Sequence, residues 1–205
     1  MMSESASLFD PQTLAFYERE AETYAGRARM LPAQRLPSFL AGLKPGARIL
    51  ELGCGGGHDA EAMLQAGFDV MPTDGSPALA SVAGRRLSRP VAVMRFDQLV
   101  ARDEFDGVWA NASLLHVPTE ALSTILARIH AALRVGGIFY ATFKSGAGEG
   151  RDDLGRYYNF PPRSMLEAAY ADAAPWADVA IEAGEGGGYD GVARVWLQVL
   201  ARKAG

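Results

Sequence analysis

The chain has 205 residues, of which 49% are hydrophobic and 21% are charged, a composition typical of a globular protein with a substantial core. Its net charge is −4, which argues against a nucleic-acid partner because such a partner needs a basic face. Residues 1–5 lack the pattern of a signal peptide, and no apolar run approaches the length of a membrane span. We therefore expect a single cytoplasmic domain that contacts no membrane.

Two helices are predicted before the first strand. Asp10 and Pro11 form a good helix start, since Asp caps the free N–H groups and Pro fits the first turn. A helix with one apolar face follows as far as Tyr24. A second, shorter helix lies within residues 30–43, where two prolines interrupt it.

From residue 47 onward, apolar strand-like runs alternate with helical ones. The predicted strands cover residues 47–50, 68–73, 91–96, 105–110 and 138–143. The predicted helices cover residues 59–65, 77–87 and 121–134. Pro72 is awkward within a strand because it cannot donate a ladder hydrogen bond, so we place it near the strand end.

The pattern changes after residue 143. Residues 145–160 show no periodicity and are predicted to form a long loop, followed by a short helix over 163–170. A strand over 179–182, a turn over 185–190 and an alternating strand over 192–202 predict a hairpin. The expected fold is α/β, with a mostly parallel sheet, helices on both faces and a C-terminal antiparallel hairpin.

The most informative segment is the glycine-rich stretch that follows the first strand. Gly53, Gly55 and Gly57 alternate there, and glycine lets a backbone turn sharply and approach a ligand closely. Asp74 follows about 20 residues later, a spacing that suits recognition of a ribose diol. A nicotinamide fingerprint would need a third glycine at position 58, which is His58.

Glu51, two residues before the first glycine, completes a motif that resembles motif I of the class I S-adenosylmethionine-dependent methyltransferases, of the small-molecule, tellurite-resistance-like type. Four further segments resemble the family's later motifs in the same order: residues 73–77, 96–99, 105–111 and 133–139. The resemblance implies a Rossmann-like fold and S-adenosylmethionine as cofactor. It also divides the chain into a helical cap (1–43), a cofactor core (44–144), a substrate loop and helix (145–175) and a hairpin (176–205).

The resemblance also implies a set of cofactor-binding residues. They are Tyr24, Arg29, Glu51, Gly53, Cys54, Gly55, Asp74, Gly75, Ser76, Asp97, Gln98, Asn111, Ala112 and Leu114. Asp74 would accept hydrogen bonds from the ribose, with a helix cap as the alternative. Asp97 would accept from the adenine amine, with a local Asx-turn as the alternative. Glu51 would orient the glycine loop or serve as a purely structural carboxylate.

Methyl transfer to an O, N or S atom of a small molecule is the predicted reaction. His116, soon after the strand over 105–110, is a candidate general base, although the sequence favours a histidine that organises its loop through hydrogen bonds. Arg156 and Tyr157 in the long loop are candidates for contact with the acceptor. The sequence Asn111-Ala112-Ser113-Leu114 lacks the asparagine-proline-proline-aromatic motif, which argues against nucleobase-amine and glutamine-amide acceptors. A non-catalytic cofactor-binding protein and a nicotinamide-dependent oxidoreductase remain as alternatives.

Overall fold

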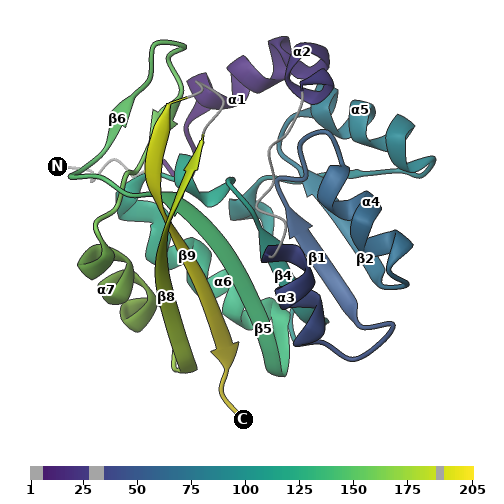
Figure 1. The fold of residues 1–205 in the computed structure, drawn as a ribbon, viewed down its shortest axis with the longest axis vertical. Coiled ribbons are helices and arrows are strands. Elements are labelled where there is room, and N and C mark those ends of the chain that lie inside the picture. The colour runs from purple at the N-terminus through teal and green to yellow at the C-terminus, as the bar shows by residue number, and fades with distance from the viewer. Residues whose placement is uncertain (1–6, 28–34, 188–191) are drawn as a thin grey trace, which may run out of the picture.

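A computed structural model describes residues 7–27, 35–187 and 192–205. Its centre is a seven-stranded sheet with the order β3-β2-β1-β4-β5-β9-β8 (Figure 1). The strands of this sheet are β1 (Arg48–Leu52), β2 (Asp69–Asp74), β3 (Ala92–Val93), β4 (Phe105–Ala110), β5 (Leu133–Lys144), β8 (Trp176–Gly187) and β9 (Ala193–Lys203). Strands β1 to β5 run parallel, and β9 runs antiparallel to both β5 and β8. The predicted fold class is confirmed.

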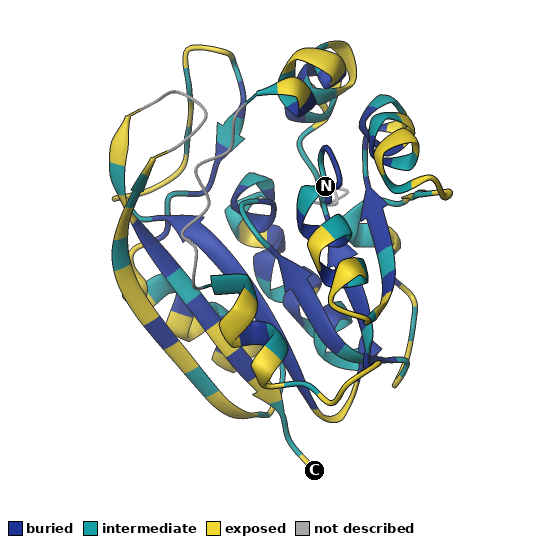
Figure 2. Ribbon diagram, turned by 45° about the vertical axis from the view of Figure 1, so that its right-hand side comes forward, coloured by how far each residue is buried: buried dark blue, intermediate teal, exposed yellow. Residues whose placement is uncertain are grey.

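Helices cover both faces of the sheet (Figures 1 and 2). The helices are α1 (Pro11–Arg19), α2 (Ala21–Gly26), α3 (Arg35–Ala41), α4 (His58–Gln65), α5 (Pro77–Leu87), α6 (Leu122–Ala132) and α7 (Arg163–Ala173). Neighbouring side chains of a strand point to opposite faces, so Ile49 packs beneath α3 and α4 whereas Leu50 packs beneath α6 and α7. None of the described helices is long and apolar enough to cross a membrane.

Several predicted element boundaries were wrong. The strand predicted over 91–96 shrinks to Ala92–Val93, because residues Phe96–Gln98 turn into a single 3-10 turn. The first helix divides at Glu20 into α1 and α2. The loop predicted over 145–160 contains a small hairpin of β6 (Gly150–Arg151) and β7 (Tyr157–Tyr158). The turn predicted over 185–190 runs into residues outside the described ranges.

Pro72 lies at the fourth of the six positions of β2 and not at its end. The carbonyl of the next residue, Thr73, accepts hydrogen bonds from the β1 side, so Pro72 directs its nitrogen toward β3. Strand β3 pairs only with Thr73 and Asp74. The missing N–H of Pro72 therefore lies where the ladder has not yet begun, and β2 behaves as an edge strand at that point.

Candidate cofactor and acceptor site

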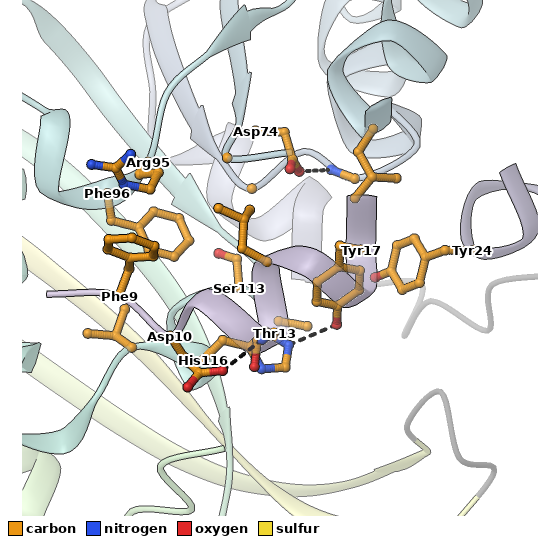
Figure 3. A pocket seen from close by; sticks show the side chains of 17 residues that line it. Phe9, Asp10, Thr13, Tyr17, Tyr24, Asp74, Arg95, Phe96, Ser113 and His116 are labelled. Atoms are coloured by element: carbon orange, nitrogen blue, oxygen red, sulfur yellow. Dashed lines mark hydrogen bonds between the residues drawn. The ribbon is translucent and has the colours of Figure 1, made fainter. Parts of the chain in front are cut away.

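A pocket opens at the carboxyl ends of β1, β2 and β4, with α1 and α2 lying over it (Figure 3). The space it encloses is about 720 Å³, its open mouth included. Its lining residues are Phe9, Asp10, Thr13, Leu14, Tyr17, Tyr24, Gly53, Gly55, Asp74, Gly75, Leu79, Arg95, Phe96, Ala112, Ser113, His116 and Val117. The residues anticipated from the sequence that meet here are Tyr24, Gly53, Gly55, Asp74, Gly75, Ala112 and His116.

The glycine loop forms one wall of the pocket, where Gly53 and Gly55 present only backbone atoms. Gly53 and Gly55 have φ values of 73° and 55°, a left-handed region that favours glycine. A Cβ on Gly53 would lie 2.6 Å from Ser113 Cβ, and one on Gly55 would lie 3.2 Å from Tyr24 Cε1. Gly57, also left-handed, is the N-cap of α4. The absence of a side chain at Gly53 and Gly55 therefore lets Ser113 and Tyr24 pack close to the glycine loop.

Asp74 ends β2 beside this loop. Its Oδ2 accepts from the Gly55 N–H at 2.9 Å, and its Oδ1 accepts from the Ser76 N–H at 2.9 Å. The cap of α5 is Ser76 itself, whose Oγ accepts from Leu79 N–H. Burial raises the pKa of Asp74 to about 6, with a smaller contribution from the charge of Glu18. The residue thus combines a structural hydrogen-bonding role with a carboxylate that lines the pocket.

Glu18 links α1 to the cofactor side of the pocket. Its Oε2 accepts from Ser76 Oγ at 2.6 Å and from the Ala78 N–H at 2.9 Å. Both donors lie at the N-terminus of α5, where the helix dipole favours a negative charge. The helix α1 is thereby anchored over the pocket.

Tyr17 and His116 lie on the opposite side, separated by 99 residues along the chain and joined by a hydrogen bond of 2.9 Å between Tyr17 Oη and His116 Nε2 (Figure 3). His116 Nδ1 lies 2.6 Å from the carbonyl oxygen of Tyr157. A carbonyl only accepts, so Nδ1 carries the proton and Nε2 accepts from Tyr17. Burial lowers the pKa of His116 to about 3, so its imidazole is neutral at ordinary pH.

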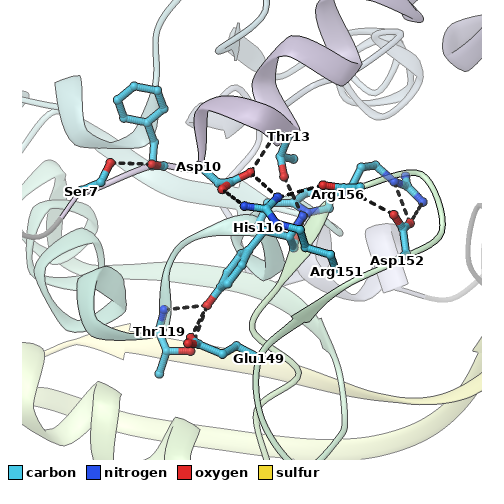
Figure 4. A network of polar contacts seen from close by, with 12 residues as sticks. Ser7, Asp10, Thr13, His116, Thr119, Glu149, Arg151, Asp152 and Arg156 are labelled. Atoms are coloured by element: carbon cyan, nitrogen blue, oxygen red, sulfur yellow. Dashed lines mark hydrogen bonds and ion pairs between the residues drawn. The ribbon is translucent and has the colours of Figure 1, made fainter.

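Arg156 contacts both Asp152 and the hydroxyl of Tyr17, and Figure 4 shows its ion pair with Asp152. Its side chain is 1% exposed, donates to Asp152 Oδ2 from Nε and Nη2, and donates from Nη1 to Tyr17 Oη at 3.1 Å. Tyr157 accepts from Thr119 N–H and donates to Glu149 with its hydroxyl. Neither Arg156 nor Tyr157, the two anticipated acceptor contacts, lines the pocket.

Other anticipated residues lie behind the pocket wall. Glu51, Cys54, Ser76 and Leu114 are buried in the described structure and absent from the lining. The side chain of Asn111 turns away toward Asp59. Arg29 lies outside the described residues.

Asp97 and Gln98 also stay off the pocket wall. Asp97 forms a two-pronged ion pair with Arg95, at 3.0 Å for both contacts. Gln98 accepts from the Arg95 N–H. Arg95 and Phe96 line the pocket instead, and the sequence analysis missed both because it considered only Asp97 and Gln98 in this segment.

The chain resembles known methyltransferases in sequence and in fold. Residues 50–141 match the family described as the methyltransferase domain. The chain is 30% identical over 138 residues to an uncharacterized methyltransferase of Synechocystis sp., covering 63% of this chain and 61% of that protein. It is 30% identical over 156 residues to the trans-aconitate 2-methyltransferase of Variovorax paradoxus, covering 73% of this chain and 54% of that protein. The chain thus spans little more than half the length of these curated relatives.

A solved structure of similar fold is the 1,6-didemethyltoxoflavin-N1-methyltransferase of Burkholderia thailandensis, with 1,6-didemethyltoxoflavin and S-adenosylhomocysteine bound. The TM-score is 0.73 at 24% identity, covering 98% of this chain and 93% of that chain. This likeness concerns the fold, and the matched domain of residues 50–141 contains the glycine loop and the acidic end of β2. The family match favours a methyltransferase over a nicotinamide-dependent enzyme. Residues 50–141 belong to the methyltransferase domain family, and the chain has the fold of the class I S-adenosylmethionine-dependent methyltransferases.

Proposed function

We propose that the protein transfers the methyl group of S-adenosylmethionine to an O, N or S atom of a small molecule. One observation carries the proposal: the glycine loop, Asp74 and the Tyr17–His116 pair all face the same pocket. The acceptors named for two similar proteins, trans-aconitate and 1,6-didemethyltoxoflavin, are small molecules and support this class of substrate.

The residues present fit the cofactor. Gly53 and Gly55 line the pocket with backbone that the amino-acid part of the cofactor would approach, and Asp74 would accept hydrogen bonds from the two ribose hydroxyls through its remaining lone pairs. Phe96 would pack against the adenine ring. Asp97 would contribute to the adenine end of the pocket indirectly, through its ion pair with Arg95. When bound, the cofactor supplies an activated methyl group on a sulfonium, so orientation of the acceptor accounts for much of the rate.

Tyr17 and His116 would remove the proton of the acceptor. The acceptor's proton would pass to Tyr17 Oη while the proton of Tyr17 passes to His116 Nε2, leaving a neutral tyrosine and an imidazolium. Burial raises the pKa of Tyr17 well above its usual range, so the hydroxyl starts protonated. A hydroxyl or amine becomes strongly acidic as the methyl group bonds to it, so even a weak base such as His116 can take up its proton. We expect this base to raise the rate about 100-fold, the lower end of the range for general-base catalysis.

A panel of small acceptors tests the proposal. The purified protein is incubated with S-adenosylmethionine and phenols, N-heteroaromatic compounds, thiols and carboxylic acids, and release of S-adenosylhomocysteine is recorded. We expect release that depends on one class of acceptor and saturates with its concentration. Cofactor binding with no acceptor-dependent release across the panel would favour a non-catalytic binding protein.

The affinity for S-adenosylhomocysteine should fall as the pH falls through 6. The ionised form of Asp74 accepts hydroxyl hydrogen bonds better than the neutral form, and its pKa of about 6 leaves it largely neutral at pH 5. If the ionised form alone binds the ribose, the dissociation constant rises about tenfold between pH 7.5 and 5. Calorimetry measures this change, and Asp74→Asn should abolish it.

The free protein should show the opposite trend from the same group. Because the pKa of Asp74 is raised above its unfolded value, this group stabilises the free fold most below about pH 4. That stability is lost as the pH rises through 6.

For the binding prediction, an affinity for S-adenosylhomocysteine that is equally pH-dependent in wild type and Asp74→Asn would assign the titration to another group.

Arg156→Ala should lower turnover at least tenfold while cofactor affinity stays within about threefold. The variant releases the Tyr17 hydroxyl from its donor, but Arg156 itself does not line the pocket. Tenfold corresponds to about 1.4 kcal/mol of transition-state stabilisation. Arg151→Ala is the matched control, since Arg151 lies on the same hairpin and pairs with Asp10 at the surface. Equal losses in the two variants would mean that the hairpin as a whole, and not the contact with Tyr17, sets the rate.

A further inference from the structure

A network of partly buried hydrogen bonds runs behind the pocket wall, from a backbone N–H to a carboxylate. The Ala112 N–H donates to Thr142 Oγ1 at 2.7 Å, and the Thr142 hydroxyl donates to Asn111 Oδ1 at 3.1 Å. Asn111 Nδ2 then donates to Asp59 Oδ2 at 3.0 Å, where Trp109 Nε1 also donates at 2.9 Å. Thr142 is 0% exposed and Asp59 is 2% exposed.

Each hydrogen bond in this network has a fixed donor and a fixed acceptor. A backbone N–H can only donate, so the Thr142 oxygen accepts from Ala112 and its own proton is left for Asn111. The Asn111 amide must then present its oxygen to Thr142 and its nitrogen to Asp59. Loss of the Thr142 hydroxyl removes the hydrogen-bond partner of both the Ala112 N–H and Asn111 Oδ1, which is costly where water is excluded.

The hydrogen-bond network begins at Ala112, the one described non-glycine residue of the pocket wall whose backbone is left-handed. Ala112 has a φ of 53°, a conformation that side-chain-bearing residues rarely adopt. The reversal at Ala112 turns Asn111 inward, while Ser113 and His116 face the pocket. Ser113 Oγ donates to the carbonyl of Leu52 at 2.7 Å, which seats this segment directly against the glycine loop.

We propose that Asp59, Asn111 and Thr142 are positioning residues, which hold Ala112 in its left-handed conformation. They thereby fix the spacing between the glycine loop and His116. None of the three lines the pocket, so they act through Ala112 and Ser113. The inference rests on the proposed function, because it takes the glycine loop as the cofactor site and His116 as part of the acceptor site.

Substitution of Thr142 tests the role without an acceptor. Thr142→Val keeps the shape but removes both hydrogen bonds, and we expect at least tenfold weaker binding of S-adenosylhomocysteine by calorimetry. Thr142→Ser keeps the hydroxyl and should bind within threefold of wild type. Tyr140→Phe is the matched control: it removes a hydroxyl from the same strand that bonds Gln198, and it should also bind within threefold.

Glycine at position 112 separates positioning from simple loss of stability. Glycine adopts a φ of 53° without strain, so Ala112→Gly added to Thr142→Val should restore affinity to within threefold of wild type. Thermal unfolding, recorded on every variant, ensures that binding is measured well below the melting temperature.

Two results would overturn the inference: Thr142→Val binding within threefold of wild type, or Thr142→Ser binding as weakly as Thr142→Val. Failure of glycine to rescue would equally contradict the role of Ala112. In each of these cases, binding of S-adenosylhomocysteine by the wild-type protein would still support the proposed cofactor site. Absence of wild-type binding would instead remove the proposed function, and this inference with it.

Discussion

Asp74→Ala should weaken binding of S-adenosylhomocysteine about 100-fold or more. Two ribose hydroxyls would donate to this carboxylate, and a hydrogen bond to a charged group contributes about 1.5–3 kcal/mol. Loss of both therefore costs at least about 3 kcal/mol, which is about two orders of magnitude in the dissociation constant. Calorimetry on the purified variant measures the loss.

The same variant also removes the acceptor of the Gly55 and Ser76 N–H groups, so its thermal stability must be recorded. Glu18→Ala is the control, because Glu18 is a carboxylate at the same helix N-terminus and is absent from the pocket lining. We expect this control to lower the melting temperature while affinity stays within about threefold. Comparable affinity in wild type and Asp74→Ala would contradict the ribose assignment.

Tyr17→Phe should lower kcat about 100-fold while cofactor affinity changes by less than about threefold. The variant keeps the ring but removes the hydroxyl that bonds His116 Nε2 and that would accept the proton of the acceptor, and general-base catalysis contributes about 100-fold at its lower end. Tyr24→Phe is the control, since Tyr24 lines the same pocket and packs edge-on against Tyr17, with 5.0 Å between the two ring centroids. Single-turnover rates with saturating cofactor isolate the chemical step.

The pH profile adds an independent check on this pair. With the pKa of His116 lowered to about 3, the imidazole stays neutral from pH 5 to 9, so kcat at saturating cofactor should show no step near pH 6.5. A kcat that survives Tyr17→Phe unchanged would return His116 to the role of a loop-organising residue, held by the Tyr157 carbonyl.

The sequence is most informative where structure is decided locally. Alternating glycines after an apolar strand specify the left-handed turns at Gly53 and Gly55, and the Ser76-Pro77 pair specifies the start of α5. Asp74 could be placed at the end of β2 for the same reason. These features depend on residues within one strand, turn and helix.

What could not be predicted depends on contacts between distant segments. Tyr17 meets His116 across 99 residues and Arg156 across 139 residues, and no local pattern encodes either hydrogen bond. The inward turn of Asn111 depends on Asp59 and Thr142, which lie on other elements. The sequence therefore identified Asn111 as a residue of interest but could not indicate which way its side chain points.

Transfer of a labelled methyl group tests the central claim most directly. The purified protein is incubated with methyl-labelled S-adenosylmethionine and a cell extract separated into small-molecule and macromolecular fractions, with Tyr17→Phe as the matched control. We expect label in a product of the small-molecule fraction, formed about 100-fold more slowly by the variant. Label confined to protein or nucleic acid, or no label above that of heat-inactivated protein, would contradict methyl transfer to a small molecule.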